Sequence, residues 1–100
     1  MEIKIDEDNV LLCPHCGESY LHHDTVNVYS RYEDGVQTMH TEIDANFQTK
    51  TALVASSTVL NPSGRRGGLS IAFWCEICTG ESTLTISQHK GRTFVNWESL

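Results

Sequence analysis

Apolar and polar residues alternate along two early stretches of the chain, residues 25–32 and 39–47. A period of two residues is typical of a β-strand that buries one face. The apolar positions expected on one face are Val26, Val28 and Tyr32 in the first stretch and Met39, Ile43, Ala45 and Phe47 in the second. Asp34-Gly35 lies between the stretches, and this dipeptide favours a hairpin turn. The pattern therefore predicts an antiparallel hairpin over residues 25–47.

The second half of the chain carries further strand signals. Residues 69–75, LSIAFWC, are apolar at consecutive positions, as in a central strand that is covered on both faces. Residues 82–97 alternate again and contain Lys90-Gly91 at a turn, which predicts a second hairpin. Residues 61–68, NPSGRRGG, have the composition of a loop. Together these segments predict a three-stranded meander at the end of the chain.

Composition agrees with a mainly β fold. Val, Ile, Thr, Tyr, Phe and Trp account for 31 of the 100 residues, whereas Ala accounts for four. Residues 48–60, QTKTALVASSTVL, fit either a strand or a mobile arm rich in Ser and Thr. A length of 100 residues predicts a single domain over residues 1–100.

The charge is negative overall and uneven along the chain. The formal net charge is −6; residues 1–44 hold ten acidic and two basic side chains, and residues 45–100 hold three acidic and five basic ones. This balance argues against polyanion binding by bulk charge but leaves room for a local basic patch. No apolar run approaches the ~20 residues of a membrane span, and the acidic N-terminus lacks a signal-peptide core. We expect a cytoplasmic chain without membrane contact, in which thiols stay reduced.

The four cysteines form two CxxC pairs, CPHC and CEIC. Two intervening residues allow a tight turn in which both thiolates reach one ion, while backbone N–H groups point at the sulfurs. Strand-like sequence flanks each pair, as in a zinc ribbon. Four thiolates complete a tetrahedral site, which predicts one structural Zn²⁺. The predicted ligands are Cys13, Cys16, Cys75 and Cys78.

Other uses of these cysteines are open on sequence alone. CPHC also occurs as a redox motif, but that chemistry needs a thiolate at a helix N-terminus in a βαβ fold. A rubredoxin-like iron site uses the same four sulfurs, whereas disulfides would fit a secreted chain. His15 lies inside the first pair and is expected to be an exposed loop residue, because four cysteines suffice. The remaining histidines are expected at the surface or hydrogen-bonded.

Basic and aromatic residues of the second half suggest a nucleic-acid alternative. Trp74, Phe94 and Trp97 are available to stack on bases, although solvated loop charge, or pairing with the acidic first half, explains the basic residues equally well. The chain contains no nucleophile elbow, P-loop or HExxH motif, and a closed Cys₄ site does not activate water, so we expect no enzyme. The candidate phosphate contacts are Arg65, Arg66, Lys90 and Arg92.

Four segments carry a family likeness: CPHCG, YLHH, NPSGRRGGLSIAFWCEIC and LTISQHKGRTFVNW. They resemble small zinc-ribbon proteins of bacteria and their prophages, and residues 36–60 match least. The resemblance implies a bacterial or phage setting and a zinc site, but no substrate. The expected fold is mainly β, a zinc ribbon with a long antiparallel β-hairpin inserted between the two CxxC pairs. The expected function is a non-catalytic, protein-binding zinc module, with nucleic-acid binding or redox chemistry as alternatives.

Overall fold

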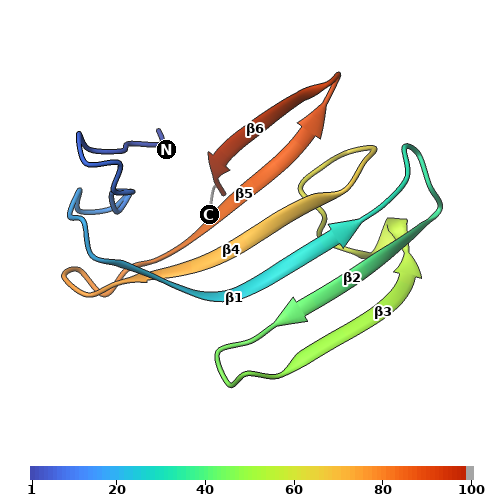
Figure 1. The fold of residues 1–100 in the computed structure, drawn as a ribbon, viewed down its shortest axis with the longest axis horizontal. Helices are drawn as coiled ribbons and strands as arrows, with labels where there is room; N and C mark the ends of the chain where they lie inside the picture. Colours follow the sequence, from blue (N-terminus) through green and yellow to red (C-terminus); the bar gives the residue numbers. More distant parts are fainter. Residues whose placement is uncertain (99–100) are drawn as a thin grey trace.

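The computed structural model describes residues 1–98, which form a mainly β fold with one antiparallel sheet of six strands (Figure 1). The strand order across the sheet is β3-β2-β1-β4-β5-β6. The strands are β1 (Leu21–Ser30), β2 (Gln37–Ile43), β3 (Thr49–Ala55), β4 (Gly68–Cys75), β5 (Glu81–His89) and β6 (Arg92–Trp97). The mainly β prediction is thereby confirmed. The described residues include no helix with the length and hydropathy needed to cross a membrane.

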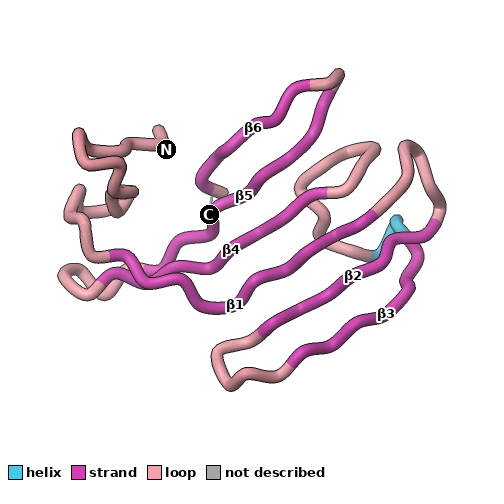
Figure 2. The backbone as a smooth tube through the Cα atoms, viewed as in Figure 1, coloured by secondary structure: helices cyan, strands magenta, loops and turns pink. Residues whose placement is uncertain are grey.

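The first four strands have Greek-key connectivity. Hairpins join β1 to β2 and β2 to β3, and the chain then returns through residues 56–67 to place β4 beside β1. Figure 2 shows this return as a long loop beyond the end of β3. Consequently β1 and β4, far apart in sequence, are neighbours in the centre of the sheet.

The predicted first hairpin is present, but its strands are shorter at the turns. Arg31 Nε donates to the Gly35 carbonyl and Gly35 N donates to the Tyr32 carbonyl, so the chain leaves the ladder after Ser30. The Asp44 carboxylate accepts from the backbone N–H groups of Asn46 and Gln48, which ends β2 at Ile43. The placement of Tyr32, Ala45 and Phe47 on the strand face was therefore wrong.

The ambiguous segment 48–60 contains a strand. β3 pairs with β2 along its whole length, from Gln37↔Ala55 to Ile43↔Thr49. A short 3₁₀ turn, η1 (Ser56–Thr58), follows it. The insertion between the cysteine pairs therefore contains a three-stranded meander where the sequence predicted a hairpin.

The strand positions predicted for the second half are confirmed: β4 lies between β1 and β5, and β4, β5 and β6 form the expected meander. The expected cover on both faces of β4 was wrong, because Leu69, Ile71 and Phe73 are only half-buried and Trp74 is 42% exposed. Lys90 (φ 51°) and Gly91 (φ 75°) both have left-handed backbone conformations, as in a type I′ hairpin turn.

Residues 1–20 precede the sheet and contain no strand. They form an isolated bridge between Ile5 and Leu11, and the Asp6 carboxylate accepts from the Asp8 and Val10 N–H groups in the intervening turn. Because this turn interrupts the extended chain, the strand expected before Cys13 is absent. The zinc-ribbon prediction placed strands on both sides of each cysteine pair, whereas the first pair is followed by a strand but not preceded by one. The buried apolar core is small: Cys13, Tyr29, Cys75, Leu84 and Trp97.

Candidate metal centre

The pairing of β1 with β4 brings the two cysteine pairs together. Leu21, the first residue of β1, lies opposite Cys75, the last residue of β4. One step further, Glu76 N donates to the Tyr20 carbonyl (3.1 Å). The first cysteine loop (residues 13–18) enters β1 at the same end of the sheet where the second cysteine loop (residues 75–80) leaves β4. Two loops about sixty residues apart in the sequence therefore meet.

The four cysteine sulfurs form one compact group. All four Sγ atoms lie within 4.8 Å of one another, with Cys13 to Cys78 at 3.7 Å and Cys16 to Cys75 at 3.6 Å. All four residues are free thiols. A tetrahedral ion with metal–sulfur bonds of about 2.3 Å implies sulfur–sulfur separations of roughly 3.8 Å. The cluster therefore has the dimensions to hold a metal ion.

The two cysteine loops repeat one backbone design. In the first loop, Cys13 N donates to Glu18 O (2.8 Å) and Gly17 N donates to Cys13 O (2.9 Å). In the second loop, Cys75 N donates to Gly80 O (3.1 Å), and Thr79 N donates to the Cys75 carbonyl (3.1 Å). The spacing of donor and acceptor is identical in the two loops, so each presents its two sulfurs in the same way.

One position in this design needs a left-handed backbone. Gly17 fills it in the first loop with φ 80°, and Thr79 fills it in the second with φ 57°. The later glycine, Gly80, has a different role, because a Cβ there would lie 2.9 Å from His15 Cδ2 and 3.1 Å from Cys78 Sγ. Gly80 thus leaves the space in which the two loops touch.

Backbone N–H groups and desolvation act in opposite directions on the cysteine pKa values. Gly80 N lies 3.4 Å from Cys78 Sγ and lowers its pKa, but desolvation and the neighbouring Cys13 and Cys75 thiols prevail and raise it. Hydrogen bonds from the Cys78 and Ile77 N–H groups lower the pKa of Cys75 to about 7, despite its desolvation. At Cys16 the Glu18 N–H lowers the pKa, but desolvation and the neighbouring thiols prevail and raise it to about 12. A metal ion must therefore displace protons from this cluster at neutral pH.

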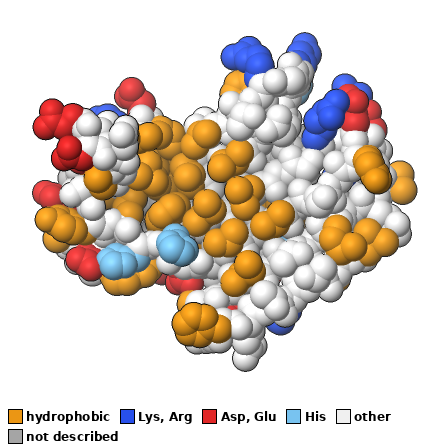
Figure 3. Space-filling model, in the orientation of Figure 1, with side chains coloured by type: hydrophobic (Ala, Val, Ile, Leu, Met, Phe, Trp, Pro, Cys, Tyr) orange, Lys and Arg blue, Asp and Glu red, His pale blue; other side chains and the backbone are white. Residues whose placement is uncertain are grey.

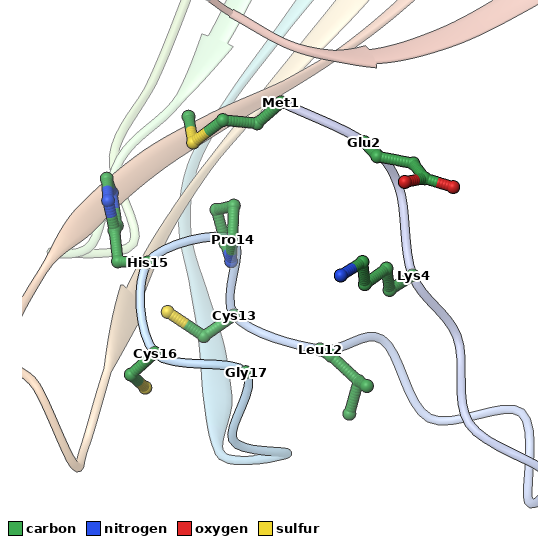
Figure 4. Close-up of a pocket in the computed structure, with 9 residues that line it drawn as sticks. All are labelled: Met1, Glu2, Lys4, Leu12, Cys13, Pro14, His15, Cys16 and Gly17. Atoms are coloured by element: carbon green, nitrogen blue, oxygen red, sulfur yellow. The ribbon is translucent and has the colours of Figure 1, made fainter.

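Burial and charge around the loops are asymmetric. Cys13 and Cys75 are buried, Cys78 is half-buried and Cys16 is exposed. Figure 4 shows the chain from Met1 to Lys4 curving around the first loop, with Lys4 beside the same cavity of about 400 Å³ that Cys13 lines.

His15 connects the first cysteine loop to the start of β5 and is not part of the sulfur cluster. Its Nε2 lies 2.9 Å from the Glu81 carbonyl at the start of β5. Its residue is exposed, as expected from sequence. Near the second loop, His22 stacks on Trp74 with ring centroids 4.4 Å apart and pairs with Glu76. These histidines are hydrogen-bonded surface residues, as expected.

The arginines of the NPSGRRGG loop are paired with acidic residues of the first half. Arg65 donates two hydrogen bonds to the Asp34 carboxylate, and Arg66 Nη2 donates to Glu33 Oε2 (2.9 Å). The Asp34 N–H also donates to the Arg65 carbonyl (2.7 Å). These contacts hold the loop against the β1–β2 turn. The carboxylates of Asp34 and Glu33 neutralise the positive charge of the two arginines, which a phosphate would otherwise bind.

Ser63 and Gly67 of this loop also make contacts within the chain. The Ser63 hydroxyl donates to Gly67 O (2.6 Å) and accepts from Gln88 N (2.9 Å). A Cβ on Gly67 would lie 2.5 Å from the Tyr29 carbonyl. Packing of the long return between β3 and β4 therefore accounts for this glycine and serine.

The remaining candidates of the proposed nucleic-acid patch lie at the β5–β6 turn. Lys90 lines a small cavity of about 70 Å³ together with Arg65, Arg66 and Glu33. Arg92 lies over the Phe94 ring, 5.0 Å from its centroid. The structure thus groups three of the four basic residues around one cavity that also contains an acidic group. Of the three aromatic residues considered for base stacking, Trp74 is stacked on His22, Phe94 lies under Arg92, and Trp97 is buried.

Comparison with known proteins gives no match, whether with protein-family models, curated proteins or solved structures. The likeness to bacterial and prophage zinc-ribbon proteins stays an expectation from sequence. The class that the fold and site define is a mainly β chain with a four-cysteine cluster able to bind a metal ion.

Proposed function

We propose that this chain is a small, non-catalytic zinc protein in which one Zn²⁺ is held by Cys13, Cys16, Cys75 and Cys78. The observation that carries the proposal is the sulfur cluster itself, with all four Sγ atoms within 4.8 Å. Zinc favours four thiolates in a tetrahedral arrangement, and such a closed site leaves no coordination position for water or substrate. The ion serves to join residues 1–20 to the sheet.

The charge of the loaded site fits its surroundings. Zinc with four thiolates carries a net charge of about −2, which the N–H groups directed at the sulfurs partly offset. The low pKa of Cys75 provides one thiolate near neutral pH. The other protons leave when the metal binds, so affinity for zinc rises with pH.

We propose that the sheet held by this site binds another protein. One face of the sheet leaves apolar side chains exposed, among them Val28, Met39 and Leu53, and apolar side chains grouped on an exposed face are typical of an interaction surface. The arginines suited to phosphate binding are engaged by Asp34 and Glu33. This combination favours a protein partner over nucleic acid.

The metal proposal is tested by elemental analysis of the full chain expressed with both zinc and iron available. The expected result is one zinc per chain and a colourless protein. Replacement by Co²⁺ should give the absorption of a tetrahedral thiolate site. Cys13→Ser and Cys78→Ser should each lose the metal under mild chelation.

His15→Ala is the matched control, since His15 lies in the first cysteine loop but outside the sulfur cluster. It should retain one zinc. A red protein containing iron would indicate a rubredoxin-like site and contradict the proposal. Equal zinc retention in wild type, Cys13→Ser and Cys78→Ser would show that the metal binds elsewhere.

A further inference from the structure

The strand registers place apolar side chains from each of the six strands on one face of the sheet, although others, such as Tyr29 and Trp74, lie on the opposite face. For example, Val26 pairs with both Ile43 and Ile71, and Ile71 pairs with Leu84, which pairs with Trp97. We call this the apolar face. Its apolar members are Leu53, Met39, Ile43, Val26, Val28, Leu69, Ile71, Phe73, Leu84, Ile86, Val95 and Trp97.

Much of the apolar face is open to solvent. Of these side chains only Leu84 and Trp97 are buried, whereas Val28, Met39, Ile43, Leu53 and Val95 are 39% to 56% exposed. Figure 3 shows hydrophobic side chains spread across the centre of the molecule in this view. On the opposite face Tyr29 is 6% exposed, whereas Trp74 is 42% exposed.

The total surface is larger than a monomer of this mass should expose. The accessible area is 6934 Å² for 11.2 kDa, whereas folded monomers of this mass expose roughly 5,700 Å². The radius of gyration, 14.5 Å, also exceeds the roughly 12.7 Å typical of 100 residues. The excess, about 1,200 Å² per chain, is comparable to the roughly 800 Å² that each partner buries in a standard interface. A second layer over the apolar face would remove it.

The chemistry of the apolar face suits a second copy of the same chain. None of the residues that the registers place on it is Lys, Arg, Asp or Glu. In Figure 3 the charged side chains lie at the periphery of the view. Because each chain carries a net charge of −6, two copies repel wherever their charged surfaces meet, and an uncharged face is where they approach at least cost.

We infer that two copies of this chain pair through their apolar faces to form a two-layer β-sandwich dimer. Facing sheets pack about 10 Å apart with their strands within about 30° of alignment. A two-fold axis brings the same face of each copy together, so an uncharged surface complements itself. This inference rests on the proposed protein-binding role and names the partner.

Sedimentation equilibrium of the zinc-loaded full chain tests the inference. Wild type should approach twice 11.2 kDa as its concentration rises. Val28→Lys and Leu53→Lys each place an unpaired charge on the apolar face, which the dimer would bury. Each should raise the dimer dissociation constant at least about tenfold, while zinc content and circular dichroism stay those of wild type.

Ala52→Lys is the matched control, because Ala52 is the exposed neighbour of Leu53 on β3 and points to the opposite face. Its dissociation constant should stay within about twofold of wild type. A wild-type chain that remains at monomer mass overturns the inference. Equal increases of the dissociation constant in Ala52→Lys and Leu53→Lys would also overturn it, as would a mass that rises beyond that of a dimer. Either result would indicate edge-to-edge association of strands.

Zinc content measured on the same samples separates the two proposals. A monomer with one zinc per chain overturns the dimer and leaves the metal site standing. A dimer without zinc overturns the metal site and leaves the dimer standing.

Discussion

At the scale of single residues, the contact between the cysteine loops depends on Gly80 more than on the left-handed position before it. Thr79 has φ 57°, a conformation that costs a non-glycine residue about 1–2 kcal/mol. Gly80 lies where a Cβ would approach the His15 ring and the Cys78 sulfur. The second loop tolerates a threonine at position 79 because the backbone strain there is modest. The glycine is needed at position 80, where there is no space for a side chain.

Gly80→Ala should therefore destabilise the site, whereas Thr79→Gly should not. The added methyl must push His15 or Cys78 aside, and we expect a loss of about 1–3 kcal/mol in stability together with weaker zinc binding. Thr79→Gly removes left-handed strain but makes the unfolded chain more flexible, so its effect should stay within about 1 kcal/mol. Thermal melting and competition with a chelator measure both effects. Equal behaviour of the two variants would contradict the assigned roles.

The Arg65–Asp34 pair gives a pH-dependent contribution to stability. A hydrogen bond from Arg65 lowers the pKa of Asp34 below its ordinary value. The pair therefore stabilises the fold above the unfolded-state pKa of about 3.9, and this stabilisation disappears as pH falls through the lowered folded-state pKa. Because both side chains are exposed, the contribution should be small.

Asp34→Asn tests this linkage and suits the left-handed backbone at this position (φ 55°). Urea unfolding of wild type and variant should differ by a constant amount above about pH 5, and the difference should shrink as the pH falls through the acid range. A difference that grows on acidification would show that the carboxylate is not stabilised by Arg65.

At the scale of elements, the sequence predicted the strands and turns that depend on the local alternation of apolar and polar residues and on turn-forming dipeptides. The β5–β6 hairpin followed from alternation and Lys90-Gly91, and β4 followed from its apolar run. β3 was ambiguous because its sequence, TKTALVA, is polar at one end and mostly exposed at an edge of the sheet. The return through residues 56–67 was not predictable, since it depends on contacts such as Arg65 with Asp34, distant in the chain.

Hydrogen bonds of the Ser56 side chain connect the end of β3 to the β1–β2 turn. Its hydroxyl donates to Gly35 O (2.7 Å) and so accepts from the Thr38 hydroxyl (2.8 Å), and Thr38 is fully buried. Ser56→Ala leaves both partners without this bond and should cost about 1–3 kcal/mol in the free energy of unfolding. The exposed neighbour Ser57→Ala should change it by less than about 0.5 kcal/mol. Urea denaturation compares the two, and a similar loss in both would show that β3 is not fastened here.

At the scale of the whole molecule, the cysteine cluster compensates for a small core. The two CxxC spacings predicted that four sulfurs would meet, and the β1–β4 pairing is the long-range feature that brings them together. The same spacings could not predict which metal binds, because sulfur ligation is shared by zinc and iron. Two of the five apolar residues that are buried within residues 1–98 are Cys13 and Cys75. A large share of the interior therefore lies at the proposed metal site.

Removing the metal should loosen the chain from that end. Residues 1–20 contain only an isolated bridge and reach the sheet through the cysteine loops, the His15–Glu81 hydrogen bond and the Glu76–Tyr20 hydrogen bond. Structural zinc contributes about 10–16 kcal/mol of apparent binding energy, comparable to the roughly 5–15 kcal/mol that holds a small domain folded. A strong chelator should abolish cooperative melting. Hydrogen exchange should then rise first in residues 1–20 and 75–80, and later in the sheet. A chelated chain that melts sharply at an unchanged temperature would show that the four thiols do not need a metal to hold the two loops together.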